Sequence, residues 1–123
     1  MTSRDGSLSI TTTTVGDVSV IRLVGEIDMT NAEAVHAELL GCLERTSAGV
    51  VVDLTDVTFL ASSGLSALVA ARSEAERRGV GLAVAAAGRA VLRPLEATRV
   101  DTMLLIHATT ADAVTALRTG SST

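Results

Sequence analysis

The chain has 123 residues, 47% of them apolar and 20% charged, and a formal net charge of −4. This length fits one domain with a single core, and the negative charge without a lysine and arginine stripe argues against binding nucleic acid. Cys42 is the only cysteine, which excludes an internal disulfide and a cysteine-based zinc site. Because residues 1–6 do not resemble a signal peptide and no apolar run reaches ~18 residues, we expect a cytoplasmic protein without membrane contact.

The N-terminal third predicts a hairpin followed by a helix. Residues 8–14 and 18–24 have the composition of strands, and Gly16-Asp17 between them suits a tight antiparallel connection. Thr30 to Glu33 has the form of a capping box, in which Thr30 accepts from a helical N–H and Glu33 reaches back. Apolar residues at helical spacing then predict a helix to about Arg45.

The middle of the chain switches from strand to helix periodicity. Residues 50–54 are nearly all apolar and rich in valine, which is typical of a strand buried on both faces. Leu65, Leu68 and Val69 have helical spacing, so we expect a helix that begins at or near Ser63, after a short loop. Gly79 is a suitable left-handed C-cap for that helix.

The C-terminal third predicts two more strands and two more helices. Residues 81–85 and 103–106 are short apolar strands, and Thr109 or Thr110 could cap a last helix that carries Ala113, Val114 and Leu117. Residues 88–98 look helical, although Pro94 should then lie near a boundary or a kink.

These elements predict an α/β fold with a mixed β-sheet of four to five strands and about four helices. Helical crossovers between successive strands require parallel pairing in the centre of the sheet, and the hairpin supplies an antiparallel edge. We expect a single domain at residues 8–118, with flexible termini at 1–7 and 119–123.

Two serines, Ser62 and Ser63, stand at the start of the second predicted helix. The simplest interpretation is an N-cap, in which a serine oxygen accepts from a backbone N–H. The same place also favours a phosphate, because the unsatisfied donors and the helix dipole both attract negative charge.

Catalytic motifs are largely missing from the sequence. No Gly-x-x-x-x-Gly-Lys-Ser/Thr loop and no dinucleotide fingerprint is present. A serine hydrolase would need Ser62 or Ser63 with His36 or His107 as base, but the Gly-x-Ser-x-Gly pattern is absent. The two histidines lack metal-ligand spacing, so we expect no metal or other cofactor.

The order of two motifs carries a family resemblance. Gly25-Glu26-Ile27-Asp28 follows an apolar strand, and Ala61-Ser62-Ser63-Gly64-Leu65 follows the strand that contains Asp53-Leu54. In this order and spacing, from about Leu8 to Leu117, the chain resembles the STAS domain and, within it, the bacterial anti-sigma factor antagonists. The resemblance implies a small mixed sheet with helices largely on one side.

The resemblance also implies a function and its residues. An antagonist of this kind has no catalysis of its own; it binds an anti-sigma factor that is also a kinase and so frees the sigma factor. The kinase phosphorylates the serine before the glycine, here Ser63, and a serine phosphatase restores the protein. Partner-binding positions would be Asp28 and Ala61, Ser62, Ser63, Gly64 and Leu65. Where many members carry an acidic residue, this chain has Ala61.

Three alternatives stay open. Asp28 could face the partner or form an Asx-type turn. The chain could have another STAS role, as a non-phosphorylated scaffold or as the soluble partner of a lipid-transport complex. The small serine hydrolase is the third.

Overall fold

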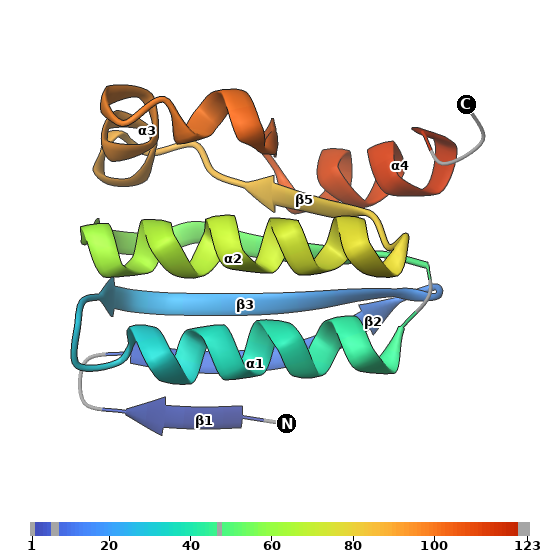
Figure 1. The fold of residues 1–123 in the computed structure, drawn as a ribbon, viewed down its shortest axis with the longest axis horizontal. Coiled ribbons are helices and arrows are strands. Elements are labelled where there is room, and N and C mark those ends of the chain that lie inside the picture. Colours follow the sequence, from blue (N-terminus) through green and yellow to red (C-terminus); the bar gives the residue numbers. More distant parts are fainter. Residues whose placement is uncertain (1, 6–7, 47, 121–123) are drawn as a thin grey trace.

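The computed structural model describes residues 2–5, 8–46 and 48–120, which form one α/β unit around a mixed sheet (Figure 1). The strands are β1 Thr2–Asp5, β2 Leu8–Val15, β3 Val18–Ile27, β4 Val50–Leu60, β5 Leu82–Ala85 and β6 Leu105–His107. The helices are α1 Ala32–Arg45, α2 Ser62–Arg78, α3 Arg89–Ala97 and α4 Thr110–Gly120, with a 3-10 helix, η1, at Val100–Met103. The predicted fold class is confirmed, and β1 adds one strand to the four to five expected.

Strand β1 lies within the segment 1–7 that we expected to be flexible. Residues 1, 6, 7 and 121–123 lie outside the described residues, so the flexible termini and the exact domain limits of 8–118 stay predictions.

The strand directions bring the strand-to-helix turns to one edge. The sheet has the sequential order β1 to β6; β1, β2 and β3 pair antiparallel, and β3 to β6 pair parallel. Val52 of β4 pairs with Ile21 of β3 and with Val84 of β5. Because parallel strands end at the same edge, the turns after β3 and β4 lie side by side there, at the left in Figure 1.

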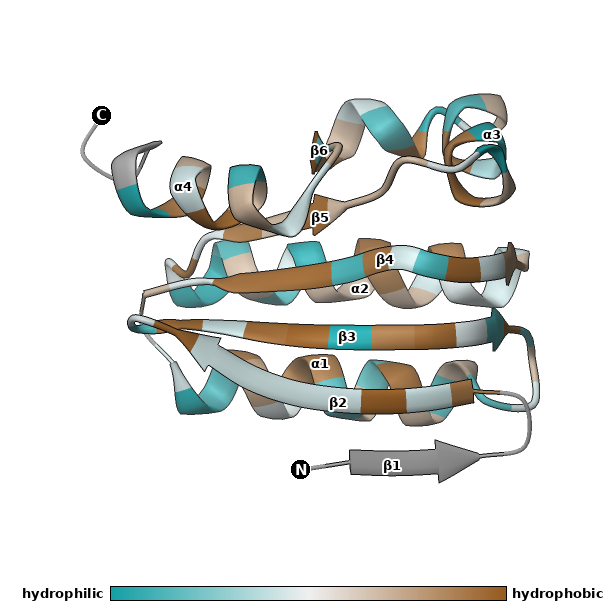
Figure 2. Cartoon of the chain, turned by 180° about the vertical axis from the view of Figure 1, so that it is seen from behind, coloured by the Kyte–Doolittle hydropathy of each residue, from teal (hydrophilic) through white to brown (hydrophobic). Residues whose placement is uncertain are grey.

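The core has two layers that follow the alternation of the strands. One face of the sheet, with Ile21, Leu23 and Val52, packs against α1, α2 and α3. The opposite face packs against α4 through Val20, Val51 and their neighbours (Figure 2). Three of the four helices therefore share one face, as the family resemblance implied.

Strand β4 is longer than expected and corrects the predicted loop after Leu54. It continues to Leu60, and only Ala61 separates it from α2. Two register irregularities in its pairing with β3 leave Thr55, Asp56 and Thr58 exposed while Val57 and Leu60 stay buried. The strand can continue through this polar segment because the register shifts break the strict alternation.

Local signals in the C-terminal half are largely confirmed. Gly79 ends α2 with a φ of 70°, and Thr109 caps α4 by accepting from the N–H of Asp112 at 3.0 Å. Pro94 lies inside α3, three residues before its end, where the helix forms despite the missing N–H. Within the described ranges, no helix is both long and apolar enough to cross a bilayer.

Candidate functional site

The turn between β3 and α1 is held by a closed network of hydrogen bonds. Asn31 is 1% exposed; its Oδ1 accepts from the backbone N–H of Asp28 at 3.0 Å, and its Nδ2 donates to the carbonyl of Glu26 at 2.9 Å. Asp28 Oδ1 accepts from the N–H of Thr30 at 2.9 Å and from its hydroxyl at 2.5 Å. These two bonds hold the pKa of Asp28 below its usual range, with the Thr30 hydroxyl as the largest cause.

The expected capping box is wrong. Asn31, not Thr30, is the residue before α1, and no side chain caps that helix. The Thr30 hydroxyl is instead committed to Asp28, which forms the Asx-type turn that we had considered. The partner-facing role of Asp28 stays a prediction, and the turn gives its carboxylate a fixed position.

The turn between β4 and α2 has no comparable network. Ala61 is the N-cap; it has no side chain that can accept a hydrogen bond, and the first turn contains no acidic residue. Ala61 is fixed through its backbone: its N–H donates to the carbonyl of Ile27 at 2.9 Å, and its carbonyl accepts from Leu65 at 3.1 Å. The start of α2 is thus rigidly tied to the end of β3, while its side chains leave the positive end of the helix without a partner.

The two serines lie on different sides of α2. Ser62 is exposed and, with Leu65, Ser66 and Val69, lines a groove of about 450 Å³ that faces the end of α3. Ser63 lines a second groove, of about 280 Å³, between α1 and α2. The 100° rotation per helical residue explains this division, because each groove is lined at the spacing i, i+3, i+4, i+7.

Ser63 has a distinctive hydroxyl. Its Oγ is buried and makes no hydrogen bond to any residue that the structure describes. The N-cap interpretation of the serines is therefore wrong. A buried hydroxyl without a partner costs stability, and Ser63 Oγ is the only buried side-chain oxygen or nitrogen of the described residues in this condition.

Gly64 and Leu65 support the turn from within. A Cβ on Gly64 would stand 2.7 Å from Leu60 Cδ1 and 2.8 Å from Ile27 Cγ2, so the absence of a side chain lets α2 approach the ends of β3 and β4. Leu65 is 6% exposed and belongs to the core. Of the predicted positions, the structure brings Asp28, Ala61, Ser62 and Ser63 together at one edge.

The groove beside Ser63 also contains two titratable residues of α1, and no motif in the sequence indicates that they lie there. Glu33 and His36 line it together with Ser63. No hydrogen bond joins His36 to Ser63 Oγ, and His107 lies in β6. The serine and histidine pair that a serine hydrolase would need is therefore not formed. In the segments that the structure describes, no group of three or more His, Cys, Asp or Glu side chains could hold a metal ion.

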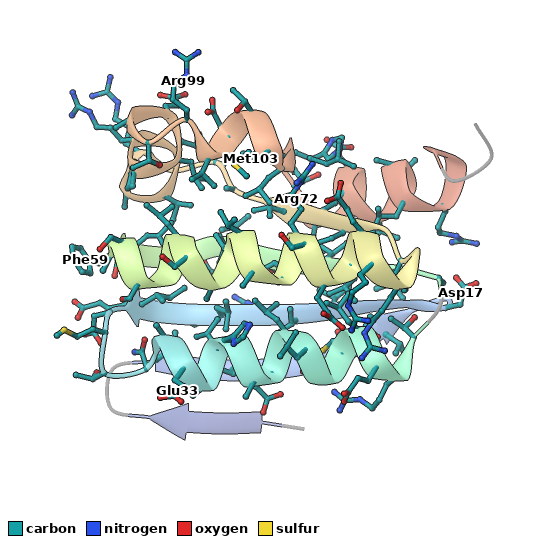
Figure 3. All side chains as sticks on the ribbon, viewed as in Figure 1. Asp17, Glu33, Phe59, Arg72, Arg99 and Met103 are labelled. Carbon is teal, nitrogen blue, oxygen red and sulfur yellow. The ribbon has the colours of Figure 1, made fainter. Side chains whose placement is uncertain are left out.

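Two exposed apolar side chains flank the same edge. Met29 is 79% exposed in the turn after β3, and Phe59 is 51% exposed near the end of β4 (Figure 3). Neither was expected, because exposure of a single apolar residue leaves no periodic signal in the sequence.

Comparisons with known proteins agree on the family. The family profile described as the STAS domain matches residues 9–113. The chain is 32% identical over 118 residues to the anti-sigma-F factor antagonist RsfB of Mycobacterium tuberculosis, with 96% of each chain covered.

Solved structures give the same result. A crystal structure of an anti-sigma factor antagonist from Mycobacterium paratuberculosis superposes with a TM-score of 0.86 at 33% identity, covering 94% of this chain and 98% of the other. The anti-sigma factor antagonist SpoIIAA in its unphosphorylated form has a TM-score of 0.74 at 19% identity, over 89% and 96% of the two chains, and shares the fold.

Proposed function

The chain belongs to the STAS domain family, and we propose that it acts as an anti-sigma factor antagonist. It binds an anti-sigma factor of the kinase type and thereby releases the sigma factor, without catalysis of its own. Its relatives with this name at 32% and 33% identity, which it matches over nearly their whole length, support the proposal. The protein would act in the cytoplasm, where sigma factors meet RNA polymerase.

Ser63 is the proposed phosphate acceptor, and the observation that carries this assignment is its unpartnered hydroxyl at the start of α2. Since no hydrogen bond holds Oγ in the groove, none has to be broken before the hydroxyl reaches the kinase. The apolar neighbours Ala32 and Ala67 offer nothing that would retain it.

The start of α2 can accept a phosphate without unfolding. The positive end of a 17-residue helix favours the added charge, and no acidic residue in the first turn opposes it. Ala61 therefore favours phosphorylation of Ser63, because it adds no negative charge at this end of the helix. Glu33, which lines the groove, repels a phosphate and directs it outward to the partner side.

Phosphorylation would then act on the interface. A phosphate adds about −1.5 to −2 charge at a serine that itself carries none. A 100-fold loss of affinity requires only ~2.7 kcal/mol, which one uncompensated charge in an interface supplies. A serine phosphatase would reverse the switch.

The surface that contacts the partner combines Asp28, Ser62 and Ser63 with the exposed Met29 and Phe59. The two apolar side chains can supply buried contact area, and Asp28 supplies a fixed charge. Gly64 and Leu65 contribute by holding the turn in place, since both are buried.

The test begins with purification of the tagged protein from its native cells and identification of the co-purifying proteins by mass spectrometry. The anti-sigma factor identified in this way is then produced and titrated by calorimetry. We expect Ser63→Asp to weaken binding by about 100-fold while the thermal midpoint stays nearly unchanged. Thr14→Asp adds the same charge at the far hairpin and should leave the affinity unchanged.

Phosphorylation is tested with the purified kinase and ATP. Ser63→Ala should bind but accept no phosphate, whereas Ser62→Ala should still be phosphorylated. Phosphate on the Ser63→Ala protein would refute the site. Recovery of a transporter ATPase in place of an anti-sigma factor would refute the antagonist function and favour another STAS role.

A further inference from the structure

Three arginines gather on and directly after α3, although the whole chain carries a net negative charge. Arg89 and Arg93 are four residues apart and so share one face of the helix, opposite the buried Val91 and Leu95. Arg99 follows the helix and extends away from the fold (Figure 3). All three are exposed, and among the described residues none has an acidic oxygen within ion-pair distance.

Arg99 has an unusual backbone for its side chain. Its φ is 63°, the left-handed region that favours glycine, and it is the only non-glycine residue of the described chain there. Thr102 fixes this turn, because its N–H and its hydroxyl both donate to the Arg99 carbonyl, at 3.2 and 2.7 Å. An arginine where glycine would relieve strain suggests that the guanidinium itself is used.

The groove that Ser62 lines reaches the chain on both sides of Arg99. Leu65 and Val69 form its α2 side, and Thr98 and Val100, the two neighbours of Arg99, form its other side. Most of the lining is apolar, and the volume of about 450 Å³ accommodates one or two large side chains. We call this groove together with Arg89, Arg93 and Arg99 the α3 surface.

The α3 surface is continuous with the proposed partner site but has the opposite charge. On the far side of α2, the site includes Asp28, and Glu33 lines the groove beside Ser63. Both residues are acidic, and neither is in an ion pair among the described residues. Ser62 belongs to both regions, because it begins α2 and lines the groove. A partner that covers the serines therefore meets negative charge toward α1 and positive charge toward α3.

We propose that the α3 surface docks an acidic amphipathic segment of the anti-sigma factor, and this rests on the proposed function. Apolar side chains of the segment fill the groove, and its carboxylates pair with the arginines. Arginine beside an apolar pocket is a frequent combination at the energetic centres of interfaces. The opposite charges on the two sides of α2 fix the orientation of the partner and raise its association rate.

Three substitutions test the docking surface with the purified anti-sigma factor as probe. Arg93→Glu should weaken binding by about 10-fold or more and reduce its dependence on salt. Arg99→Gly should weaken binding by about 3- to 10-fold while the thermal midpoint stays equal or rises, because glycine relieves the backbone strain. Val69→Thr, which keeps the shape but adds a hydroxyl, should weaken binding about 3-fold.

Matched controls lie at the far end of the molecule. Arg118→Glu makes the same charge change on exposed α4, and Val15→Thr makes the same isosteric change at the exposed hairpin end. Both should keep the affinity within about 2-fold. Restoration of binding to Arg93→Glu by replacing an acidic residue of the anti-sigma factor with arginine would establish the contact.

The outcomes separate this inference from the proposed function. If Ser63→Asp weakens binding and the α3 variants do not, the antagonist function stands and the docking surface is refuted. If the anti-sigma factor binds none of the proteins, both are refuted. Loss of binding to anionic phospholipid vesicles in Arg93→Glu, with unchanged affinity for the anti-sigma factor, would overturn the docking surface and assign the arginines to a membrane.

Discussion

The starts of α1 and α2 follow neighbouring parallel strands at the same edge of the sheet, yet they are built in opposite ways. Before α1, the buried Asn31 amide and the Asp28 carboxylate satisfy the turn through four hydrogen bonds. Before α2, Ala61 provides no side-chain partner and Ser63 Oγ stays unpaired.

Under the proposed function, this difference separates stability from regulation within one edge of the fold. The α1 turn is complete within the chain and fixes the geometry of the edge. The α2 turn leaves the Ser63 hydroxyl and the positive end of the helix without a side-chain partner among the described residues. Polar groups without a hydrogen-bond partner are expected at functional sites.

Among substitutions at the two turns, Asn31→Ala should have the largest effect on stability. It removes the partners of the Asp28 N–H and the Glu26 carbonyl, so the free energy of unfolding should fall by about 2–3 kcal/mol. Urea denaturation measures this. Asn31→Asp keeps the acceptor but loses the donor, so its free energy of unfolding should lie between those of the unmodified protein and Asn31→Ala. A loss of less than about 0.5 kcal/mol for Asn31→Ala would contradict the structural role of the turn.

Gly64→Ala tests how tightly α2 is seated. Its Cβ would meet Leu60 and Ile27 below 3 Å, and we expect the free energy of unfolding to fall by about 1–3 kcal/mol. Gly41→Ala in α1 is the matched control: its nearest contact is the flexible Arg45 guanidinium, so the change should stabilise by about 0.5–1 kcal/mol. If Gly64→Ala stabilised the protein as Gly41→Ala should, the close contacts of a Cβ with Leu60 and Ile27 would have no energetic cost.

Ser63→Ala should stabilise the protein by about 0.5–1 kcal/mol, because it removes a buried hydroxyl without a partner and introduces a better helix former. Ser62→Ala changes an exposed residue of the same helix turn and should gain less. Thermal and urea denaturation distinguish the two. A destabilised Ser63→Ala protein would mean that Oγ has a partner in solution.

The smallest expected effect concerns pH. Since the folded pKa of Asp28 is lowered, its contribution to stability is present above its unfolded pKa of about 3.9 and is lost as the pH falls through the folded pKa. Asp28→Asn should therefore show a smaller loss of stability than the unmodified protein as the pH falls below about 4. Thr30→Ala should remove most of the same contribution, because the Thr30 hydroxyl is its largest cause.

The elements with local signals were predictable. The hairpin, the buried face of α1 and the C-cap at Gly79 depend on residues within one or two turns of each other, and the sequence determined them. The motif order around Asp28 and Ser63 also determined the family, and with it the fold class.

Other features depended on residues far apart in the chain. Strand β4 continues through Asp56 because β3, about 30 residues earlier, pairs with it through two bulges. The sequence places Asn31 inside a predicted capping box. In the structure its amide instead donates to the carbonyl of Glu26, because the turn closes over the end of β3.

The candidate site divides in the same way. The sequence by itself placed two serines at a helix start, because periodicity and turn chemistry act over a few residues. Only the tertiary structure decided that Ser63 Oγ is buried beside α1, that Ser62 lines a groove with Thr98 and Val100, and that α3 lies at the same end of the molecule (Figure 1). The physical reason is that groove linings and charge on a surface depend on how helices pack on a registered sheet, and local sequence does not encode that packing.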